Sequence, residues 1–112
     1  MNGATHARWS GAVPPGRDEL NERFDRAGLN ARWWSNGPGE TYDAHAHSYD
    51  KILYCAAGSI TFRLPDGHVR LGPGDRLDIR RGVEHAATVG ERGVTCVEAG
   101  VEDGPDDQGP RA

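Results

Sequence analysis

Apolar residues along the chain recur mainly in short runs, with glycine, proline or aspartate between the runs. Alternation with a period of two places the apolar side chains on one face of an extended strand. Ser59–Leu64 alternates in this way, and the Pro65-Asp66-Gly67 sequence that follows is typical of a hairpin turn. The segments that we predict to be strands are 31–35, 51–57, 59–64, 68–71, 75–80, 85–89 and 94–99. Short strands with frequent turns predict an all-β domain, either a closed barrel or a sandwich.

Glycines mark the expected ends of several of these strands. Gly58 follows the apolar run 52–57 and is expected to end that strand at a turn. Gly90-Glu91-Arg92-Gly93 separates the segments 85–89 and 94–99. We therefore predict that these two segments form the last hairpin of the chain.

One segment has the period of a helix instead. In Arg17–Ala27, the apolar residues Leu20, Phe24 and Ala27 are spaced at i, i+4 and i+7, which gives a narrow apolar stripe. Gly28 follows directly, at the position where a left-handed C-terminal cap is expected. This short N-terminal helix is expected to cover an open edge or end of the β-structure and to carry no chemistry.

The two ends of the chain are expected to lie outside the folded domain, which we place at residues 17–100. Residues 1–16 mix small and polar side chains and are predicted to be a flexible lead. Residues 101–112 are acidic, rich in glycine and proline and almost free of apolar groups, so we predict a disordered tail. The adjacent Trp33 and Trp34 point to opposite faces of a strand. One is expected in the core and the other either under the helix or at an interface with a partner.

Composition narrows the range of functions. The chain has 112 residues and a formal net charge of −4, which indicates one small domain without a basic footprint for nucleic acid. No apolar run approaches the roughly 18–20 residues of a membrane span. The N-terminus lacks the apolar stretch of a secretory signal, so a cytoplasmic protein is expected. Cys55 and Cys96 lie in predicted strands; we expect buried free thiols, and a bridge between them remains an alternative.

Three histidines carry the candidate chemistry. His45 and His47 are separated by one residue, so on a strand their imidazoles point the same way and form half of a transition-metal site. His85 is the candidate for the third ligand. Three imidazoles suit a catalytic type of metal centre, which keeps a position open for water or substrate. Zn, Fe(II), Ni or Cu fits such ligands, and the alternative is that the histidines are polar residues that meet no ion.

The spacing around these histidines resembles the two conserved motifs of the cupin superfamily. The resemblance covers roughly residues 30–100 and is carried by Gly39, His45-x-His47 and Gly58 in the first motif and by Gly74, Gly82 and His85 in the second. It implies a double-stranded β-helix, the small jelly-roll barrel of cupins, with a site in the mouth of the barrel. It also implies that His45, His47 and His85 bind a divalent transition metal such as Zn, Fe, Ni or Mn, and that two chains associate as a homodimer.

The sequence departs from the cupin pattern where the family has its glutamate ligand, because that position is Lys51. Three readings of Lys51 are open. The side chain turns aside and pairs with Asp50, Glu84 or Glu98, which leaves a centre of three histidines. It fills the site itself, in which case the protein is a metal-free cupin that binds an anionic ligand. It is desolvated and acts as a base or an electrophile.

Further side chains could line the pocket. Tyr49 shares the inward parity of the histidine pair, and Tyr42 lies just before it; either could hydrogen-bond a substrate or orient an imidazole. Glu84, next to His85, is a candidate partner for that imidazole.

Two functional classes follow. The first is a metal-dependent oxygenase or isomerase/lyase that acts on a small metabolite. The second is a cupin that binds or senses a small anionic ligand without turnover. The sequence identifies no catalytic residue and no reaction.

Overall fold

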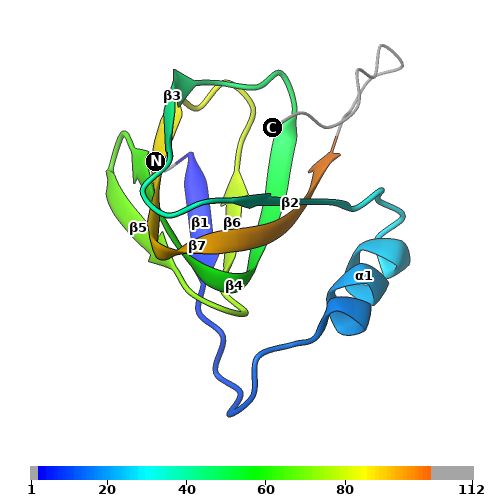
Figure 1. Ribbon diagram of the computed structural model, residues 1–112. Helices are drawn as coiled ribbons and strands as arrows, with labels where there is room; N and C mark the ends of the chain where they lie inside the picture. Colours follow the sequence, from blue (N-terminus) through cyan, green and yellow to red (C-terminus); the bar gives the residue numbers. More distant parts are fainter. Residues whose placement is uncertain (1–2, 102–112) are drawn as a thin grey trace.

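The computed structural model describes residues 3–101. Apart from Val101, the predicted acidic tail lies outside these residues. The elements in chain order are β1 (Ala4–Ala7), α1 (Arg17–Arg26), β2 (Arg32–Asn36), β3 (Thr41–His45), β4 (Asp50–Leu64), β5 (Gly67–Leu71), β6 (Arg76–Ile79) and β7 (His85–Val101). Figure 1 shows the strands wrapped around a common interior, with α1 outside them.

Two long strands, β4 and β7, form the frame of the domain. They pair antiparallel from Asp50↔Val101 to Arg63↔Ala86, with irregular register between Gly58 and Ile60. The predicted hairpin at 90–93 and the predicted strand end at Gly58 are therefore wrong, because each long strand bends and continues. At the bend, Gly58 has a φ of 73°, and a Cβ there would lie 2.0 Å from the carbonyl oxygen of Gly93. Glycine at this position thus allows the two bent strands to approach closely.

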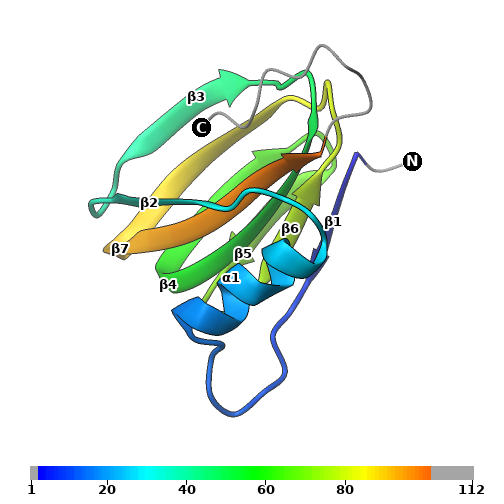
Figure 2. The same ribbon diagram turned by 90° about the vertical axis from the view of Figure 1, so that its right-hand side faces the viewer.

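The bends close the sheet on itself. The strand order is β1-β6-β4-β7-β2, while β3 pairs with the other half of β7 and β5 pairs with the other half of β4. Figure 2 shows the resulting two layers, which share β4 and β7. This arrangement confirms the predicted all-β fold with a jelly-roll barrel and one helix.

Inward-facing side chains of both layers fill the barrel. The buried cluster comprises Leu53, Cys55, Ile60, Phe62, Leu71, Leu77, Ile79, Ala87, Val89, Val94 and Cys96. Cys55 and Cys96 are cross-strand partners, and both are buried free thiols, as expected.

The helix packs on the outer face of β4 and β7. Leu20 and Phe24 are buried in a second cluster with Tyr54, Val97 and Ala99. The predicted cap at Gly28 is confirmed, since this residue has a φ of 74° and Leu29 N–H donates to Phe24 C=O at 2.9 Å. Within residues 3–101, α1 is the only helix, and it lacks the length and apolar character to cross a membrane.

The two tryptophans divide between the two clusters. Trp34 packs against the barrel interior and Trp33 against the helix cluster. The indole Nε1–H of Trp33 donates to Asn21 Oδ1 of α1 at 2.8 Å. Of the two places predicted for the second tryptophan, the structure therefore shows the one under the helix.

Within the predicted flexible lead, residues 3–16 contain a strand. Ala4–Ala7 form β1, which pairs antiparallel with β6 at the edge of the sheet. The Trp9 N–H donates to the buried carboxylate of Asp75 at 2.7 Å. We did not predict this strand, because an edge strand of small and polar residues lacks apolar alternation.

Candidate metal centre

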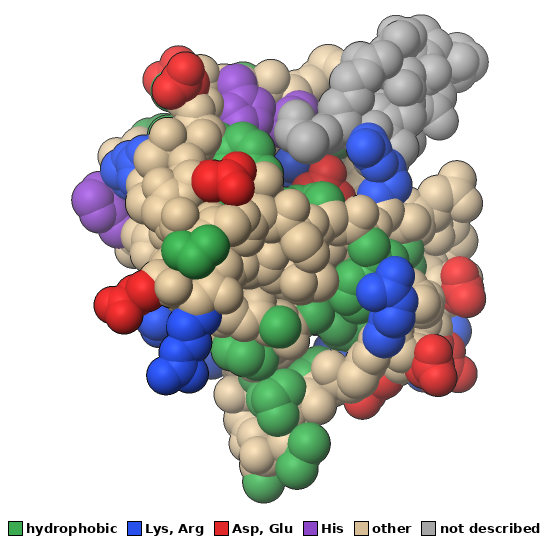
Figure 3. Space-filling model, in the orientation of Figure 1, with side chains coloured by type: hydrophobic (Ala, Val, Ile, Leu, Met, Phe, Trp, Pro, Cys, Tyr) green, Lys and Arg blue, Asp and Glu red, His purple; other side chains and the backbone are tan. Residues whose placement is uncertain are grey.

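The ends of two paired strands bring the three histidines together. His45 is the last residue of β3 and is the cross-strand partner of His85, the first residue of β7. His47 follows two residues after β3 ends. The ring centroids lie 4.5 Å apart for His45 and His85, 4.9 Å for His45 and His47, and 5.2 Å for His47 and His85. Figure 3 shows histidine side chains at the surface near the end of the barrel where β3 stops.

The imidazoles are oriented so that ring nitrogens converge. One ring nitrogen from each histidine lies within 4.8 Å of the others. The Nδ1 of His45 lies 2.7 Å from the carbonyl oxygen of Asp43, and the Nδ1 of His85 lies 3.0 Å from that of Val83. Because a carbonyl only accepts, both rings carry their proton on Nδ1 and leave the Nε2 lone pair free. Such a hydrogen bond from the second nitrogen is typical of metal-binding histidines.

His47 provides the strongest sign that the cluster is incomplete. Its Nε2 is buried and has no hydrogen-bond partner among the described residues. Burial, and next the positive charge of Lys51, lower the pKa of His47 to about 4. Burial also lowers the pKa of His85. Neutral imidazoles with free lone pairs are the form that binds a metal ion.

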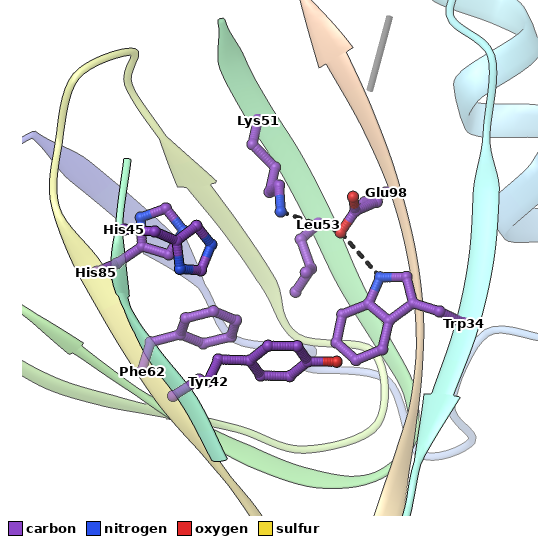
Figure 4. A pocket seen from close by; sticks show the side chains of 9 residues that line it. Trp34, Tyr42, His45, Lys51, Leu53, Phe62, His85 and Glu98 are labelled. Carbon is purple, nitrogen blue, oxygen red and sulfur yellow. Dashed lines mark hydrogen bonds and ion pairs between the residues drawn. The ribbon is translucent and has the colours of Figure 1, made fainter. Parts of the chain in front are cut away.

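A narrow cavity opens beside the cluster. It is lined by Trp34, Tyr42, His45, Lys51, Leu53, Phe62, His85, Ala87 and Glu98. All of its empty space, including open solvent at the mouth, amounts to about 320 Å³. The space in which the centre of a water molecule can lie is only about 20 Å³, which is room for about one or two water molecules. In Figure 4, His45 and His85 stand on one side of the cavity and Glu98 on the other.

Lys51 faces the cavity and is paired. Its Nζ lies 3.3 Å from Glu98 Oε1, and the two side chains are only 6% and 1% exposed. The same carboxylate oxygen accepts a hydrogen bond from Trp34 Nε1–H at 2.8 Å. The pairing with Glu98 is one of those expected in the first reading of Lys51, although the side chain lines the pocket and does not turn aside from it.

A comparison with family models matches the cupin domain over residues 32–97. The chain belongs to the cupin family. No curated protein matches it.

Several solved structures share the fold. A cupin superfamily protein from Desulfitobacterium hafniense matches with a TM-score of 0.61 and 14% identity, over 89% of this chain and 78% of that protein. An oxalate decarboxylase variant from Bacillus subtilis matches with a TM-score of 0.60 and 20% identity, over 66% of this chain but only 21% of the enzyme. A structure of dimethylsulfoniopropionate (DMSP) lyases matches with a TM-score of 0.60 and 21% identity, over 75% of this chain and 43% of that chain. At these identities the comparisons establish a common fold.

The remaining predicted site residues of this cupin differ in their positions. Tyr42 lines the cavity, and its hydroxyl is hydrogen-bonded to Asn36 Oδ1. Burial raises the pKa of Tyr42. Tyr49 does not line the cavity; it is buried behind the cluster and stacks on His47, with ring centroids 4.9 Å apart. Glu84 is exposed and does not line the cavity.

The sequence pointed less clearly to three further lining residues. In the sequence analysis, Glu98 appeared only as one of several partners for Lys51, and Trp34 only as one of two tryptophans of which one was expected in the core. Phe62 appeared only as part of the predicted strand Ser59–Leu64. The signal that could have identified Glu98 is a carboxylate inside the apolar run Cys96–Ala99, on the same strand face as Cys96.

Proposed function

We propose that this cupin binds a divalent transition metal through His45, His47 and His85 and holds a small molecule in the adjoining cavity. The observation that carries this proposal is the convergence of one nitrogen from each imidazole within 4.8 Å. The buried, unpartnered Nε2 of His47 adds support, because a buried nitrogen without a partner is unfavourable and a metal ion would satisfy it.

The residues present fit a metal of the catalytic type. Three neutral imidazoles suit Zn, Fe, Ni, Mn or Cu and leave at least one position for another ligand. A metal in this position would polarise an oxygen atom of a substrate or activate O₂. The protein contributes the backbone carbonyls that fix His45 and His85, and the apolar walls of Leu53 and Phe62, which limit access of water.

The reaction class is proposed more broadly, as an oxygenase or an isomerase/lyase acting on a small metabolite. Among the structures that share the fold are an oxalate decarboxylase with Mn(II) centres and DMSP lyases. The small interior of the cavity is consistent with a substrate of few atoms.

The alternative is a metal-free cupin that binds a small anion without turnover, with Lys51 as the cation. The pairing of Lys51 with Glu98 weighs against this alternative, since the carboxylate balances the positive charge. A ligand anion would have to compete with Glu98 for the ammonium group.

Two further features stay predictions. A cytoplasmic location is consistent with two buried free thiols that face each other across paired strands. A homodimer no longer has support from the tryptophans, because α1 of the same chain covers Trp33. A sedimentation mass equal to two chains would support the dimer, and a mass equal to one chain would contradict it.

The metal centre can be tested by metal analysis of protein purified without a histidine tag. We expect about one transition metal ion per chain in the wild type, and a loss of at least about tenfold in affinity in His45→Ala and in His85→Ala. His68→Ala is the matched control, because His68 is exposed on β5 and should leave metal content unchanged. A wild type that takes up no metal after reconstitution would exclude the proposed centre.

A further inference from the structure

The carboxylate of Glu98 is only half satisfied. Oε1 accepts a hydrogen bond from Trp34 Nε1–H and forms an ion pair with the Lys51 ammonium group. Oε2 is buried and has no hydrogen-bond partner among the described residues, although the side chain is 99% buried. An unsatisfied carboxylate oxygen inside a protein is strongly unfavourable, so a donor from outside the described residues is expected at this atom.

Glu98 lies where a bound small molecule would meet it. It lines the same cavity as His45 and His85, on the opposite side (Figure 4). Trp34 and Lys51 come from other strands, β2 and β4, and fix Oε1 from two directions. The carboxylate therefore has little freedom to turn Oε2 toward a donor of its own chain.

Glu98 does not serve as a replacement for the metal-binding glutamate that is absent at position 51. Among the described residues, the group whose ligand atoms lie close enough to share an ion contains His45, His47 and His85 and no carboxylate. The free oxygen of Glu98 is thus available to a molecule in the cavity.

We propose that Glu98 Oε2 selects the ligand of this site, by accepting a hydrogen bond from a hydroxyl or ammonium group on the side of the ligand that faces away from the histidines. This inference rests on the proposed metal centre for the other end of the ligand. Imidazoles bind a metal as neutral groups, and Lys51 and Glu98 carry opposite charges, so the lining supplies no net negative charge. An anionic oxygen of the ligand would balance the charge of a divalent ion held by the histidines. The chemical class is therefore a small carboxylate that also carries a hydroxyl or an ammonium group.

The size of the cavity limits the ligand to a small molecule. Because there is room for only about one or two water molecules, a two- or three-carbon ligand would also occupy the mouth of the cavity, within the empty space of about 320 Å³. The apolar side chains of Leu53 and Phe62 would contact the carbon atoms of the ligand.

Lactate carries a hydroxyl group on its middle carbon, which can donate a hydrogen bond. Pyruvate carries a carbonyl oxygen at the same carbon, which can only accept one. The two molecules are therefore suitable probes. We would measure the dissociation constants of L-lactate, D-lactate and pyruvate by calorimetry with zinc-loaded protein. In the wild type we expect at least one lactate enantiomer to bind about ten- to a hundredfold more tightly than pyruvate, the range for a hydrogen bond to a charged group. In Glu98→Gln the side-chain amide can place a donor where Oε2 lies, so the preference should disappear or reverse toward pyruvate.

Two variants complete the test. Glu91→Gln, at the exposed bend of β7, is the matched control and should keep the preference of the wild type. Glu98→Gln leaves the buried Lys51 without a charged partner, so this single variant could fail to fold. The double variant Lys51→Met/Glu98→Gln removes both charges. It provides the same readout in that case. Equal affinities in the wild type, or an unchanged preference in the Gln variants, would overturn the role of Glu98.

The same experiment separates this inference from the metal centre. Zinc content is measured on the same samples, and failure to bind zinc contradicts the metal centre alone. The lactate and pyruvate titrations are then repeated on metal-free protein, where the hydroxyl preference and its dependence on Glu98 should persist at lower affinity. Absence of a preference there would overturn the assignment of Glu98.

Discussion

Replacing Lys51 by methionine should destabilise the protein strongly. Methionine retains most of the apolar length of lysine but removes the ammonium group that lies 3.3 Å from Glu98. The carboxylate, 1% exposed, would then keep Trp34 as its only hydrogen-bond partner within the described residues. Removing one partner of a buried ion pair typically costs about 3–5 kcal/mol. This is a large part of the roughly 5–15 kcal/mol that stabilises a small domain.

A double variant separates the charge effect from the loss of packing. In Lys51→Met/Glu98→Gln no buried charge remains, and the glutamine can still accept the hydrogen bond of Trp34. We therefore expect the double variant to be more stable than Lys51→Met alone, and within about 1–2 kcal/mol of the wild type.

Urea unfolding followed by tryptophan fluorescence measures these free energies. Arg26→Met is the matched control, because Arg26 forms an ion pair with Glu22 at 3.0 Å but both side chains are more than half exposed. Its cost should stay below about 1 kcal/mol. If Lys51→Met costs no more than Arg26→Met, or if the double variant is less stable than Lys51→Met, the buried ion pair does not have the energetic role that its geometry indicates.

Two further predictions concern the bend of the barrel and the histidine cluster. Gly58→Ala should cost more than about 2 kcal/mol in urea unfolding, because it adds a clash with the Gly93 carbonyl to the cost of a positive φ. Gly28 has a similar φ, but a Cβ there would meet no atom within 4 Å, so Gly28→Ala should cost only about 1–2 kcal/mol. Equal costs for Gly58→Ala and Gly28→Ala would contradict the clash. In metal-free protein, the lowered pKa of His47 means that the unfolded chain binds protons more readily than the folded chain. The free energy of unfolding should therefore fall as the pH decreases from about 6.5 to about 4, and thermal unfolding of His47→Ala should depend less on pH in this range.

Patterns among neighbouring residues were enough to predict the helix. The bends of the long strands and the pairing of the edge strand depend on contacts between distant residues. The stripe of Leu20 and Phe24 and the cap at Gly28 depend on neighbours within one or two turns, and the structure confirms the helix. The bend at Gly58 was misread, because a glycine between apolar runs is compatible with either a turn or a bulge in a continuous strand. Only the pairing with β7 distinguishes the two. β1 was missed for a similar reason, since its stability comes from β6 and not from its own pattern.

The candidate site has the same division between local and long-range information. Strand parity and the motif spacing singled out His45, His47 and His85. The packing that holds the His47 ring in position, however, depends on a residue of β7. Gly100 lies opposite Lys51, and a Cβ at Gly100 would lie 2.8 Å from Cδ1 of Tyr49. The missing side chain leaves room for the Tyr49 ring, which stacks on His47 from behind. The position of one candidate ligand therefore depends on a glycine at the far end of the chain, a relation that becomes apparent only when the register of β4 and β7 is known.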